Sequence, residues 1–409
     1  MHPVPNPDHR AYEPTGETVR GADAIRGALL ESARRLFEQT FSAKPTAYGY
    51  APGRVNLIGE HIDYSGGFVL PIAIERQTIV VGDLIAEPRL DVVSTARPDE
   101  IVRIPLSGLS PGIVKGWSRY VAGVVALSAS AAAPENRGFR LAIASDVPLG
   151  AGLSSSAALE VATAMCIHAL CSPDTTPDLA KLVRLCRRAE HEYAGVPCGI
   201  MDQYISANAR RGTALLIDCH SQSHREVPIA DEVEIVIADS GVKHELADGE
   251  YAKRRAACER VLAAIRAAVG ARESLRHCSL ADLAAASPDP VDARCARHAI
   301  TECARTLAAA IALERRDWNT AGKLMGESHR SLRDDYRVSC TELDVLAEIM
   351  SAIPGVFGAR MTGGGFGGCV IALTDRGRAQ AVCDELAKEN RSPLVFATSP
   401  ASGAGFGRI

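Results

Sequence analysis

A segment rich in glycine and serine has the composition of a loop that could bind phosphate. Its sequence is Gly150-Ala151-Gly152-Leu153-Ser154-Ser155-Ser156-Ala157-Ala158. Glycines let a backbone approach a ligand closely, and a helix that begins just after them directs free N–H groups and a positive dipole end at an anion. An ordinary turn with one serine capping the helix is the simpler interpretation, because no Walker A sequence follows. The segment therefore needs independent support.

A second candidate segment places polar side chains directly after a short apolar run. Glu60 and His61 follow Leu57-Ile58-Gly59, Asp63 comes two residues later, and Arg54 precedes the run. Charged groups at the end of a strand are costly to bury without partners. A surface turn would explain the residues from Asp63 onward but not Glu60 and His61. Carboxylates and imidazoles hydrogen-bond well to sugar hydroxyls.

Two further segments combine glycine with functional side chains or with other glycines. The stretch 198–203 reads Cys-Gly-Ile-Met-Asp-Gln and places Asp202 near the start of an expected helix, where an N-cap is the simplest interpretation. Residues 363–368 read Gly-Gly-Gly-Phe-Gly-Gly. Four such segments in one chain are hard to explain as unrelated turns.

Composition excludes several classes of function. With 409 residues, of which 47% are hydrophobic, the chain can bury a large core and form two domains. A net charge of -4 provides no basic footprint for nucleic acid, and no apolar run is long enough to cross a membrane. The 12 cysteines are scattered, without a C-x-x-C pair or a signal peptide, and the histidines lack zinc-ligand spacing. We therefore expect reduced thiols in a cytoplasmic protein.

Hydrophobic periodicity and turn residues predict mixed helices and strands. We expect a loose leader at residues 1–21, an N-terminal domain at 22–219 and a C-terminal domain at 220–409. Thr176 and Thr341 are expected to cap helices, and Gly195 to end one. The expected helices are 24–41, 155–170, 251–269, 291–313, 341–353 and 379–388, and the expected strands are 47–50, one beginning at residue 54, 356–361, 369–373 and 394–397. This order indicates an α+β fold.

The four segments, taken in order, resemble the galactokinases, a family in the kinase superfamily that includes homoserine and mevalonate kinases. The resemblance covers residues 47–374 and rests on 53–61, 150–158, 198–203 and 363–368. It implies a ribosomal-protein-S5-like N-terminal domain with a ferredoxin-like C-terminal domain. It also implies transfer of the γ-phosphoryl group of ATP to the anomeric hydroxyl of galactose, with Mg²⁺ as cofactor.

The resemblance assigns roles to individual residues. The expected catalytic pair is Asp202 and Arg54, and Ser156 and Glu190 are expected near the magnesium ion. The loop from Gly150 to Ser156 is expected to hold the ATP phosphates. The expected sugar-contacting residues are Glu60, His61, Asp63, Gly199 and Tyr251, and the further nucleotide contacts are Trp117 near adenine and Lys243 near phosphate. Asp202 either removes the sugar proton late in the transfer or orients the hydroxyl in a loose transition state.

Three alternatives remain at this stage. The first alternative is an N-acetylgalactosamine kinase, because Ile62 also appears in that group. Against this alternative, Val242 to Ala247 and Arg254-Arg255 are more similar to galactokinases. A non-catalytic sensor of galactose and ATP is disfavoured by the intact set of Ser156, Glu190 and Asp202. A Rossmann-type dehydrogenase is disfavoured because no G-x-G-x-x-G lies between a strand and a helix. The sequence carries no signal for a particular oligomeric state.

Overall fold

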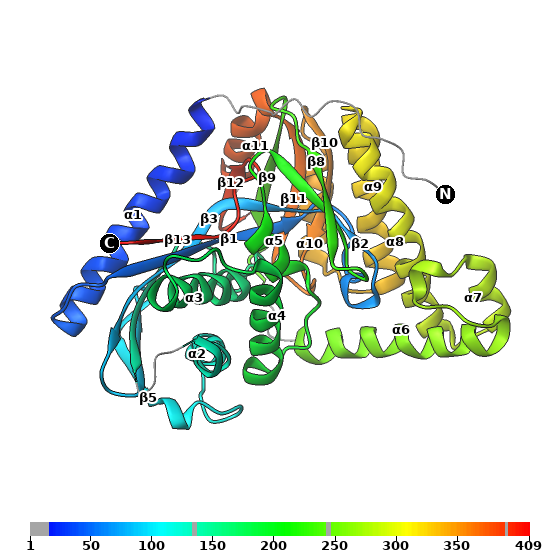
Figure 1. Cartoon of the computed structure of the whole chain (residues 1–409). Helices are drawn as coiled ribbons and strands as arrows, with labels where there is room; N and C mark the ends of the chain where they lie inside the picture. The colour runs from blue at the N-terminus through cyan, green and yellow to red at the C-terminus, as the bar shows by residue number, and fades with distance from the viewer. Residues whose placement is uncertain (1–15, 133–136, 243–246, 389–391) are drawn as a thin grey trace.

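The computed structural model describes residues 16–132, 137–242, 247–388 and 392–409, which form an α+β fold as expected (Figure 1). The helices are α1 Gly16–Phe41, α2 Ser118–Ala132, α3 Ser155–Cys171, α4 Leu179–Ala189, α5 Met201–Asn208, α6 Ala247–Val269, α7 Leu280–Ala286, α8 Pro290–Glu314, α9 Trp318–Ser331, α10 Thr341–Ala352 and α11 Arg376–Lys388. The strands are β1 Ala47–Asn56, β2 Phe68–Val69, β3 Pro71–Ile85, β4 Arg89–Ser94, β5 Arg97–Pro105, β6 Gly138–Ser145, β7 Thr213–Asp218, β8 Ser223–Pro228, β9 Val233–Asp239, β10 Val356–Thr362, β11 Cys369–Asp375, β12 Val395–Thr398 and β13 Gly405–Arg408.

The first sheet has six strands in the order β13-β1-β3-β6-β4-β5. Helix α1 covers one face, where Phe37 packs with Ile79 and Val81. Helix α3 packs against β1 and β3 on the other face. The contact with β1 is so close that a Cβ on Gly49 would lie 2.4 Å from the carbonyl oxygen of Ala162. A helix and a strand this near each other fix the start of α3 relative to the end of β1.

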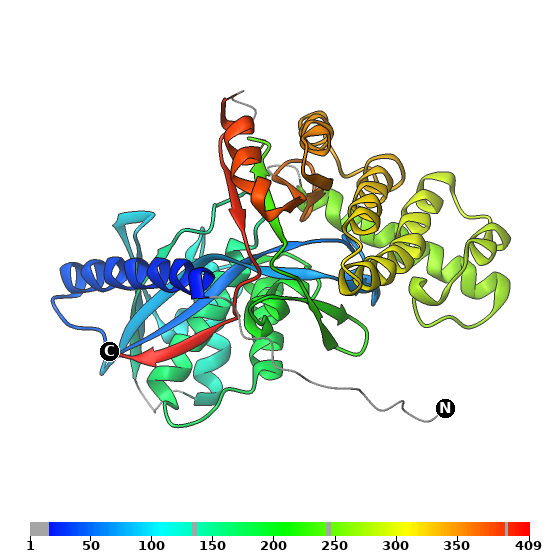
Figure 2. The ribbon, with the colours of Figure 1, turned by 90° about the horizontal axis from the view of Figure 1, so that it is seen from above.

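The second sheet has four strands in the order β10-β11-β9-β12, and neighbouring strands are antiparallel. Helices α9 and α10 pack against β10, while α11 packs against β9 and β12. Where α9 meets β10, a Cβ on Gly322 would lie 2.1 Å from the carbonyl oxygen of Phe357, so this contact requires glycine. Figure 2 shows α1 at one end of the molecule and α6 to α9 at the opposite end.

Two short pairings connect distant parts of the chain. A third sheet with the order β2-β7-β8 joins the segment after β1 to the strands that follow α5. Strand β13 pairs antiparallel with β1, with Ala47 opposite Arg408. The end of the region predicted as a C-terminal domain therefore lies in the first sheet, beside the strand that leads into the candidate site.

Most predicted elements occur, with boundary corrections. Helix α1 begins at Gly16, inside the segment expected to be loose; residues 1–15 of that segment lie outside the described ranges. The strands expected at 47–50 and from residue 54 form one continuous strand with a bulge between Pro52 and Arg54. Asp178, not Thr176, caps α4, because its side chain accepts from the Lys181 N–H. Thr341 is the first residue of α10 rather than its cap.

Other observations concern cysteines, helix ends and membrane spans. All twelve cysteines lie in the described residues as free thiols. Gly195 ends the helical turn at Glu190–Ala194 in a left-handed conformation, as predicted. In the parts of the chain that the structure describes, no helix combines the length and apolar character needed to cross a lipid bilayer.

Candidate active site

The four segments singled out in the sequence meet around one cavity of about 310 Å³. The expected site residues that line it are Arg54, Glu60, His61, Asp63, Gly150, Gly152, Leu153, Ser154, Ser155, Ser156, Glu190, Gly199 and Asp202. The other lining residues are Tyr120, Gly195, Val196, Pro197, Cys198, Met201, Gly363 and Gly364. Segments more than 300 positions apart in the sequence thus contribute to the same space.

The loop before α3 has the backbone of an anion-binding loop. Gly150 and Gly152 have φ angles of 75° and 72°, in the left-handed region that glycine adopts at no steric cost. Ser154, the residue before the helix, is also left-handed, and its side chain makes no capping hydrogen bond. The first N–H groups of a helix have no partner within the helix. The serine cap of the simpler interpretation is therefore absent, and this helix end faces the cavity.

Arg54 and Asp202 form a bidentate ion pair at the junction of the loop at residues 150–156 and the loop at residues 57–63. Nε and Nη2 of Arg54 donate to the two carboxylate oxygens of Asp202 at 2.8 and 2.7 Å. The third guanidinium nitrogen, Nη1, donates to the Gly152 carbonyl at 2.6 Å, and Ser154 Oγ donates to Asp202 at 2.5 Å. The planar guanidinium and the carboxylate hold each other in one orientation. Asp202 lies in the first turn of α5 and not at its N-cap.

The charge of Arg54 is secured by its carboxylate partner. Burial lowers the pKa of Arg54, but the charge and hydrogen bonds of Asp202 outweigh burial, so its pKa lies above the usual value. Arg54 is only 5% exposed, whereas the side chain of Asp202 is 25% exposed. Arg54 is thus buried and held in one orientation, whereas part of the Asp202 side chain is exposed in the cavity.

A second acidic cluster lies beside the start of α3. Gln203 Nε2 donates to Glu190 at 2.5 Å and to the fully buried Glu160 at 3.1 Å. Cys198 Sγ lies 3.2 Å from the same Glu190 oxygen, and Ser156 also hydrogen-bonds to this carboxylate. Burial, followed by the charge of Asp202, raises the pKa of Glu190. A cation near Glu190 and Ser156 would offset the clustering of negative charge here.

Asp63 and Gly199 pack closely against each other at the cavity wall. A Cβ added to Gly199 would lie 1.6 Å from Asp63 Oδ2, so this position accepts only glycine while Asp63 stays in place. Burial, followed by the charge of Asp202, raises the pKa of Asp63 to about 6. The Asp63 carboxylate therefore explains why position 199 is a glycine.

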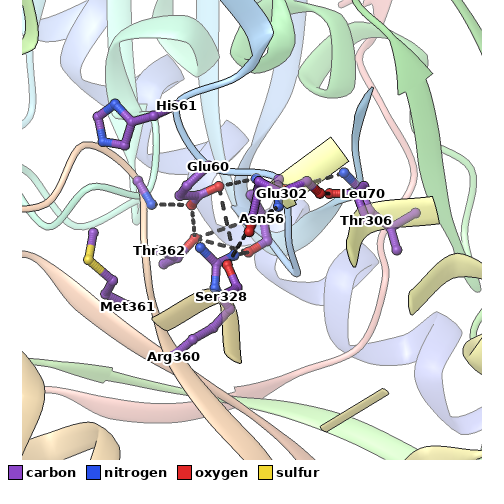
Figure 3. Close-up of polar contacts among 12 residues, drawn as sticks. Asn56, Glu60, His61, Leu70, Glu302, Thr306, Ser328, Arg360, Met361 and Thr362 are labelled. Atoms are coloured by element: carbon purple, nitrogen blue, oxygen red, sulfur yellow. Dashed lines mark hydrogen bonds and ion pairs between the residues drawn. The ribbon is translucent and has the colours of Figure 1, made fainter. Parts of the chain in front are cut away.

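Glu60 is the centre of a buried polar network that joins the loop after β1 to the end of β10 (Figure 3). Its Oε1 accepts from the Gly363 N–H at 2.5 Å and from Thr362 Oγ1 at 3.1 Å. Asn56 donates to Oε2, and Arg360 lies 3.8 Å from the same oxygen. Burial raises the pKa of Glu60, although the charge of Arg360 opposes this shift. Glu60 is 1% exposed and Arg360 is 0% exposed.

A second buried carboxylate, Glu302 on α8, extends this network. It accepts from the Gly59 N–H at 3.0 Å and from the Ser328 hydroxyl. Arg305 donates to its other oxygen at 2.8 Å. The charges of His298, Arg305 and Arg360 hold the pKa of Glu302 below its usual value against the opposing effect of burial. Helix α8 therefore fixes the backbone immediately before Glu60.

Some expected site residues lie elsewhere. Ala151 is buried in an apolar cluster, and Trp117 packs against the large core beside α2 without lining the cavity. Tyr251 lies on α6, but its side chain is outside the described part of the structure, as is Lys243.

Residues that sequence reasoning missed are those that support the site from behind. Arg360 had a visible signal, because it is the only charged residue in the strand Val356–Thr362. Glu302 and His298 are four residues apart and so share one face of a helix, but nothing in the sequence shows that this face meets the loop after β1. Tyr120 follows Trp117 by one helical turn and lines the cavity instead.

The fold and the motifs match the GHMP class of small-molecule kinases. The model described as GHMP kinases N terminal domain matches residues 119–210, and that described as GHMP kinases C terminal matches residues 309–392. The galactokinase galactose-binding signature matches residues 35–83. The residues matched by this signature include Arg54, Glu60, His61 and Asp63.

Similarity to whole proteins narrows the class to one family. The chain is 45% identical over 385 residues to galactokinase of Homo sapiens, covering 91% of this chain and 95% of that protein. It is 46% identical over 352 residues to galactokinase of Chloroflexus aurantiacus, covering 84% and 88%. The solved structure of Lactococcus lactis galactokinase complexed with galactose matches with a TM-score of 0.85 and 31% identity, covering 92% and 99%. The chain belongs to the galactokinase family.

Proposed function

We propose that this chain transfers the γ-phosphoryl group of ATP to the anomeric hydroxyl of galactose and releases galactose 1-phosphate and ADP. The observation that carries the proposal is the bidentate Arg54–Asp202 pair, which lies where the phosphate loop (residues 150–156) meets the loop of Glu60, His61 and Asp63. A sugar hydroxyl next to Asp202 would face a γ-phosphate held at the start of α3. Curated relatives with about 45% identity are galactokinases, and the galactose-binding signature supports the sugar.

In the proposed reaction, the sugar oxygen forms a bond to phosphorus while the bond from phosphorus to the β-phosphate oxygen breaks. With Asp202 as late proton acceptor, the hydroxyl proton moves to its carboxylate oxygen and then to solvent; with Asp202 as orienting group, the proton passes to the transferred phosphoryl group and then to solvent. Arg54 orients this carboxylate and places positive charge near the transferred group. Phosphoryl transfer depends mainly on positioning and charge stabilisation. We retain both roles for Asp202, late proton acceptor or orienting group, because its hydrogen bonds to Arg54 and Ser154 leave either possible.

We assign ATP to the α3 end of the cavity. The left-handed glycines at 150 and 152 and the uncapped start of α3 suit the phosphates. Trp117 remains our proposed contact near adenine, as the resemblance to galactokinases implies; its indole N–H has no hydrogen-bond partner among the described residues. Tyr251 and Lys243 remain proposed contacts of sugar and phosphate.

The residues at the acidic cluster fit Mg²⁺. In the described ranges, no three His, Cys, Asp or Glu side chains form a set that could hold a metal ion by themselves. Mg²⁺ suits this arrangement, because it is commonly bound by one or two protein oxygens together with substrate phosphates. The carboxylate of Glu190 and the hydroxyl of Ser156 are the proposed ligands. A bound Mg²⁺ would neutralise phosphate charge.

We further propose the finer fold and location. The second sheet has the order β10-β11-β9-β12, with helices between β9 and β10 and between β11 and β12, which supports a ferredoxin-like C-terminal domain. We assign the first sheet to a ribosomal-protein-S5-like N-terminal domain. Twelve free thiols support a reducing compartment, and we propose the cytoplasm.

The competing sugar is N-acetylgalactosamine. Ile62 does not read the sugar directly, because it is fully buried and a Cβ on Gly67 would lie 2.8 Å from its side chain. The test supplies galactose and N-acetylgalactosamine separately and in competition, and measures ADP release and the sugar phosphate. We expect ADP release to be faster with galactose than with N-acetylgalactosamine. Binding of galactose and ATP without ADP release would instead support a sensor, and preference for the acetylated sugar would overturn our assignment.

A further inference from the structure

We infer that Tyr64 and Tyr336 are positioning residues for His61: their hydroxyls hold the imidazole in one tautomer, with the proton on Nε2, and so tie the sugar loop (residues 57–63) to the glycine loop. The functional part of this inference rests on the proposed galactose site, since His61 is a proposed sugar contact. The structural part, the tautomer, does not depend on the substrate.

The tautomer follows from two hydrogen-bonding contacts of the ring. His61 Nε2 lies 3.1 Å from the carbonyl oxygen of Gly364, and Nδ1 lies 3.2 Å from the hydroxyl of Tyr64. A carbonyl can only accept, so Nε2 must carry a proton to make the first bond. Burial, followed by the charge of His298, lowers the pKa of His61 to about 3, so the ring is neutral near pH 7 and has only one N–H. Nδ1 must then accept from Tyr64.

This choice sets the direction of the whole chain of hydrogen bonds. Tyr64 has one hydroxyl proton, and it is directed to His61, so in its short hydrogen bond with Tyr336 the Tyr64 oxygen accepts. Tyr336 can in turn accept from the thiol of Cys258, whose Sγ is 3.8 Å away. Burial is the main cause that raises the pKa of both phenols and raises that of Cys258 to about 12, so each group keeps the proton that it donates.

This series of hydrogen bonds can position His61 because the residues that form it come from separate elements of the fold. Tyr64 follows the loop after β1, Tyr336 ends the turn at Leu332–Tyr336 after α9, and Cys258 lies on α6. The Tyr336 ring also lies between two imidazoles, with centroids 4.8 Å from His61 and 4.8 Å from His298. His61 itself has a φ of 61°, in the region that side chains rarely adopt. Contacts with Tyr64 and with Tyr336, which Cys258 contacts in turn, therefore hold a strained residue at the cavity wall.

The bond from Nε2 to Gly364 shows what the tautomer does. Gly364 belongs to the glycine loop that also gives the Gly363 N–H to Glu60. If the proton moved to Nδ1, Nε2 and the carbonyl of Gly364 would face each other as two acceptors. The glycine loop would then lose one of its contacts with the sugar loop. We therefore expect the tyrosines to affect galactose binding more than ATP binding.

The tautomer is tested by NMR on the full chain, uniformly labelled with ¹⁵N in histidine. Two-bond proton–nitrogen correlations distinguish a protonated from an unprotonated ring nitrogen, and loss of signals in His61→Gln identifies His61. We expect an unprotonated Nδ1 and a protonated Nε2 at pH 7.5 without substrate, and a change of this pattern in Tyr64→Phe. A proton on Nδ1, or on both nitrogens, in the unaltered chain would overturn the inference.

The functional consequence is tested by kinetics with a matched control. Tyr64→Phe and Tyr336→Phe each remove one hydroxyl, and we expect a roughly two- to tenfold rise in KM for galactose, the range that loss of one hydrogen bond produces, with little change in KM for ATP. The control is Tyr204→Phe, since the Tyr204 hydroxyl makes a comparable bond of 2.8 Å to Nδ1 of His224 away from the cavity. We expect that control to leave both constants unchanged.

Each outcome separates the two proposals. Equal changes in both KM values, or an unchanged KM for galactose in Tyr64→Phe, would overturn the positioning role. If Tyr336→Phe does not fold, Tyr64→Phe and the tautomer of the unaltered chain decide the matter. Failure of the unaltered chain to phosphorylate galactose would overturn the proposed function, and the NMR result would still show whether the tautomer is right.

Discussion

The two sides of the cavity are built differently. On the side that we propose binds phosphate (the phosphate side), Asp202 keeps a quarter of its side chain exposed, and its partners lie on β1 and in the loop before α3. On the side that we propose binds the sugar (the sugar side), Glu60, Glu302 and Arg360 are almost fully buried and are linked through β10, α8 and α9. A buried charge that loses its partner destabilises the fold, whereas a partly exposed one can be solvated. Substitutions on the phosphate side should therefore impair turnover, and those in the buried network should impair stability.

The largest effect is expected for Asp202→Asn. The amide keeps the size of the side chain but cannot accept the sugar proton, and we expect kcat to fall by about 10⁴-fold, the upper range for loss of an acid–base group. Binding of ATP should persist. Steady-state ADP release measures the first effect and titration calorimetry with ATP the second; near-normal turnover would contradict the assignment of Asp202.

In the buried network on the sugar side, Arg360→Met should lower the free energy of unfolding. It removes the positive charge next to Glu60 and Glu302, and we expect about 3–5 kcal/mol less free energy of unfolding, the usual consequence of leaving buried charges unpaired. Urea denaturation followed by circular dichroism measures this.

The control for Arg360→Met is Arg316→Met, which breaks an exposed pair with Glu232 at 2.7 Å. Exposed pairs contribute about 0–1 kcal/mol. A loss in Arg360→Met no larger than in this control would show that the buried charges are compensated by other groups.

Arg54→Ala should sharpen the comparison, because Arg54 is buried yet belongs to the phosphate side. We expect kcat to fall by about 10²–10³-fold, as when a preorganised donor is removed from a transition state. The change in the dissociation constant for galactose should be smaller. Kinetics combined with equilibrium sugar binding separates these effects, and an effect confined to sugar affinity would argue against a role in transfer.

The smallest effect is expected for Asp63→Asn. Burial raises the pKa of Asp63 to about 6, so its ionised form is disfavoured in the folded chain relative to the unfolded one. Its favourable contribution is present below its unfolded pKa and is lost as the pH rises through 6. Asp63→Asn should therefore increase the free energy of unfolding by about 1–3 kcal/mol at pH 8, with no gain near pH 4. Urea denaturation at both pH values measures this, and an equal change at both would exclude titration of Asp63 as its cause.

The sequence predicted the groups that face the cavity better than those behind them. Glycines and charges after apolar runs marked Arg54, Glu60 and Asp202, and the structure brings these residues together. By contrast, the Arg360–Glu60 contact joins residues 300 positions apart and depends on how β10 meets β1, which no local pattern encodes. Similarly, the serine cap that was the simpler interpretation of this segment is absent because Ser154 instead donates to Asp202, a partner supplied by tertiary structure.

Helices and strands were also predictable where local sequence determines them and not where tertiary contacts do. The long amphipathic helix ending at Phe41 and the alanine-rich α6 and α8 were predictable from periodicity. The largely buried β3 was not predicted, because a strand covered on both faces by α1 and α3 loses the alternation that marks a half-exposed strand. The cap at Asp178 rather than Thr176 depends on which of two nearby oxygens reaches the Lys181 N–H.

The pairing of β13 with β1 has a consequence for how the chain is made. Residues 47–50 emerge from the ribosome early and pair with β3 on one edge, but their partners on the other edge, residues 405–408, follow all the other strands. Until then, β1 presents an unpaired edge, and such edges can pair with strands of other molecules. Nascent chains that pause late in translation should therefore be the ones that most need a chaperone, even though nearly every residue of the cavity has already been synthesised.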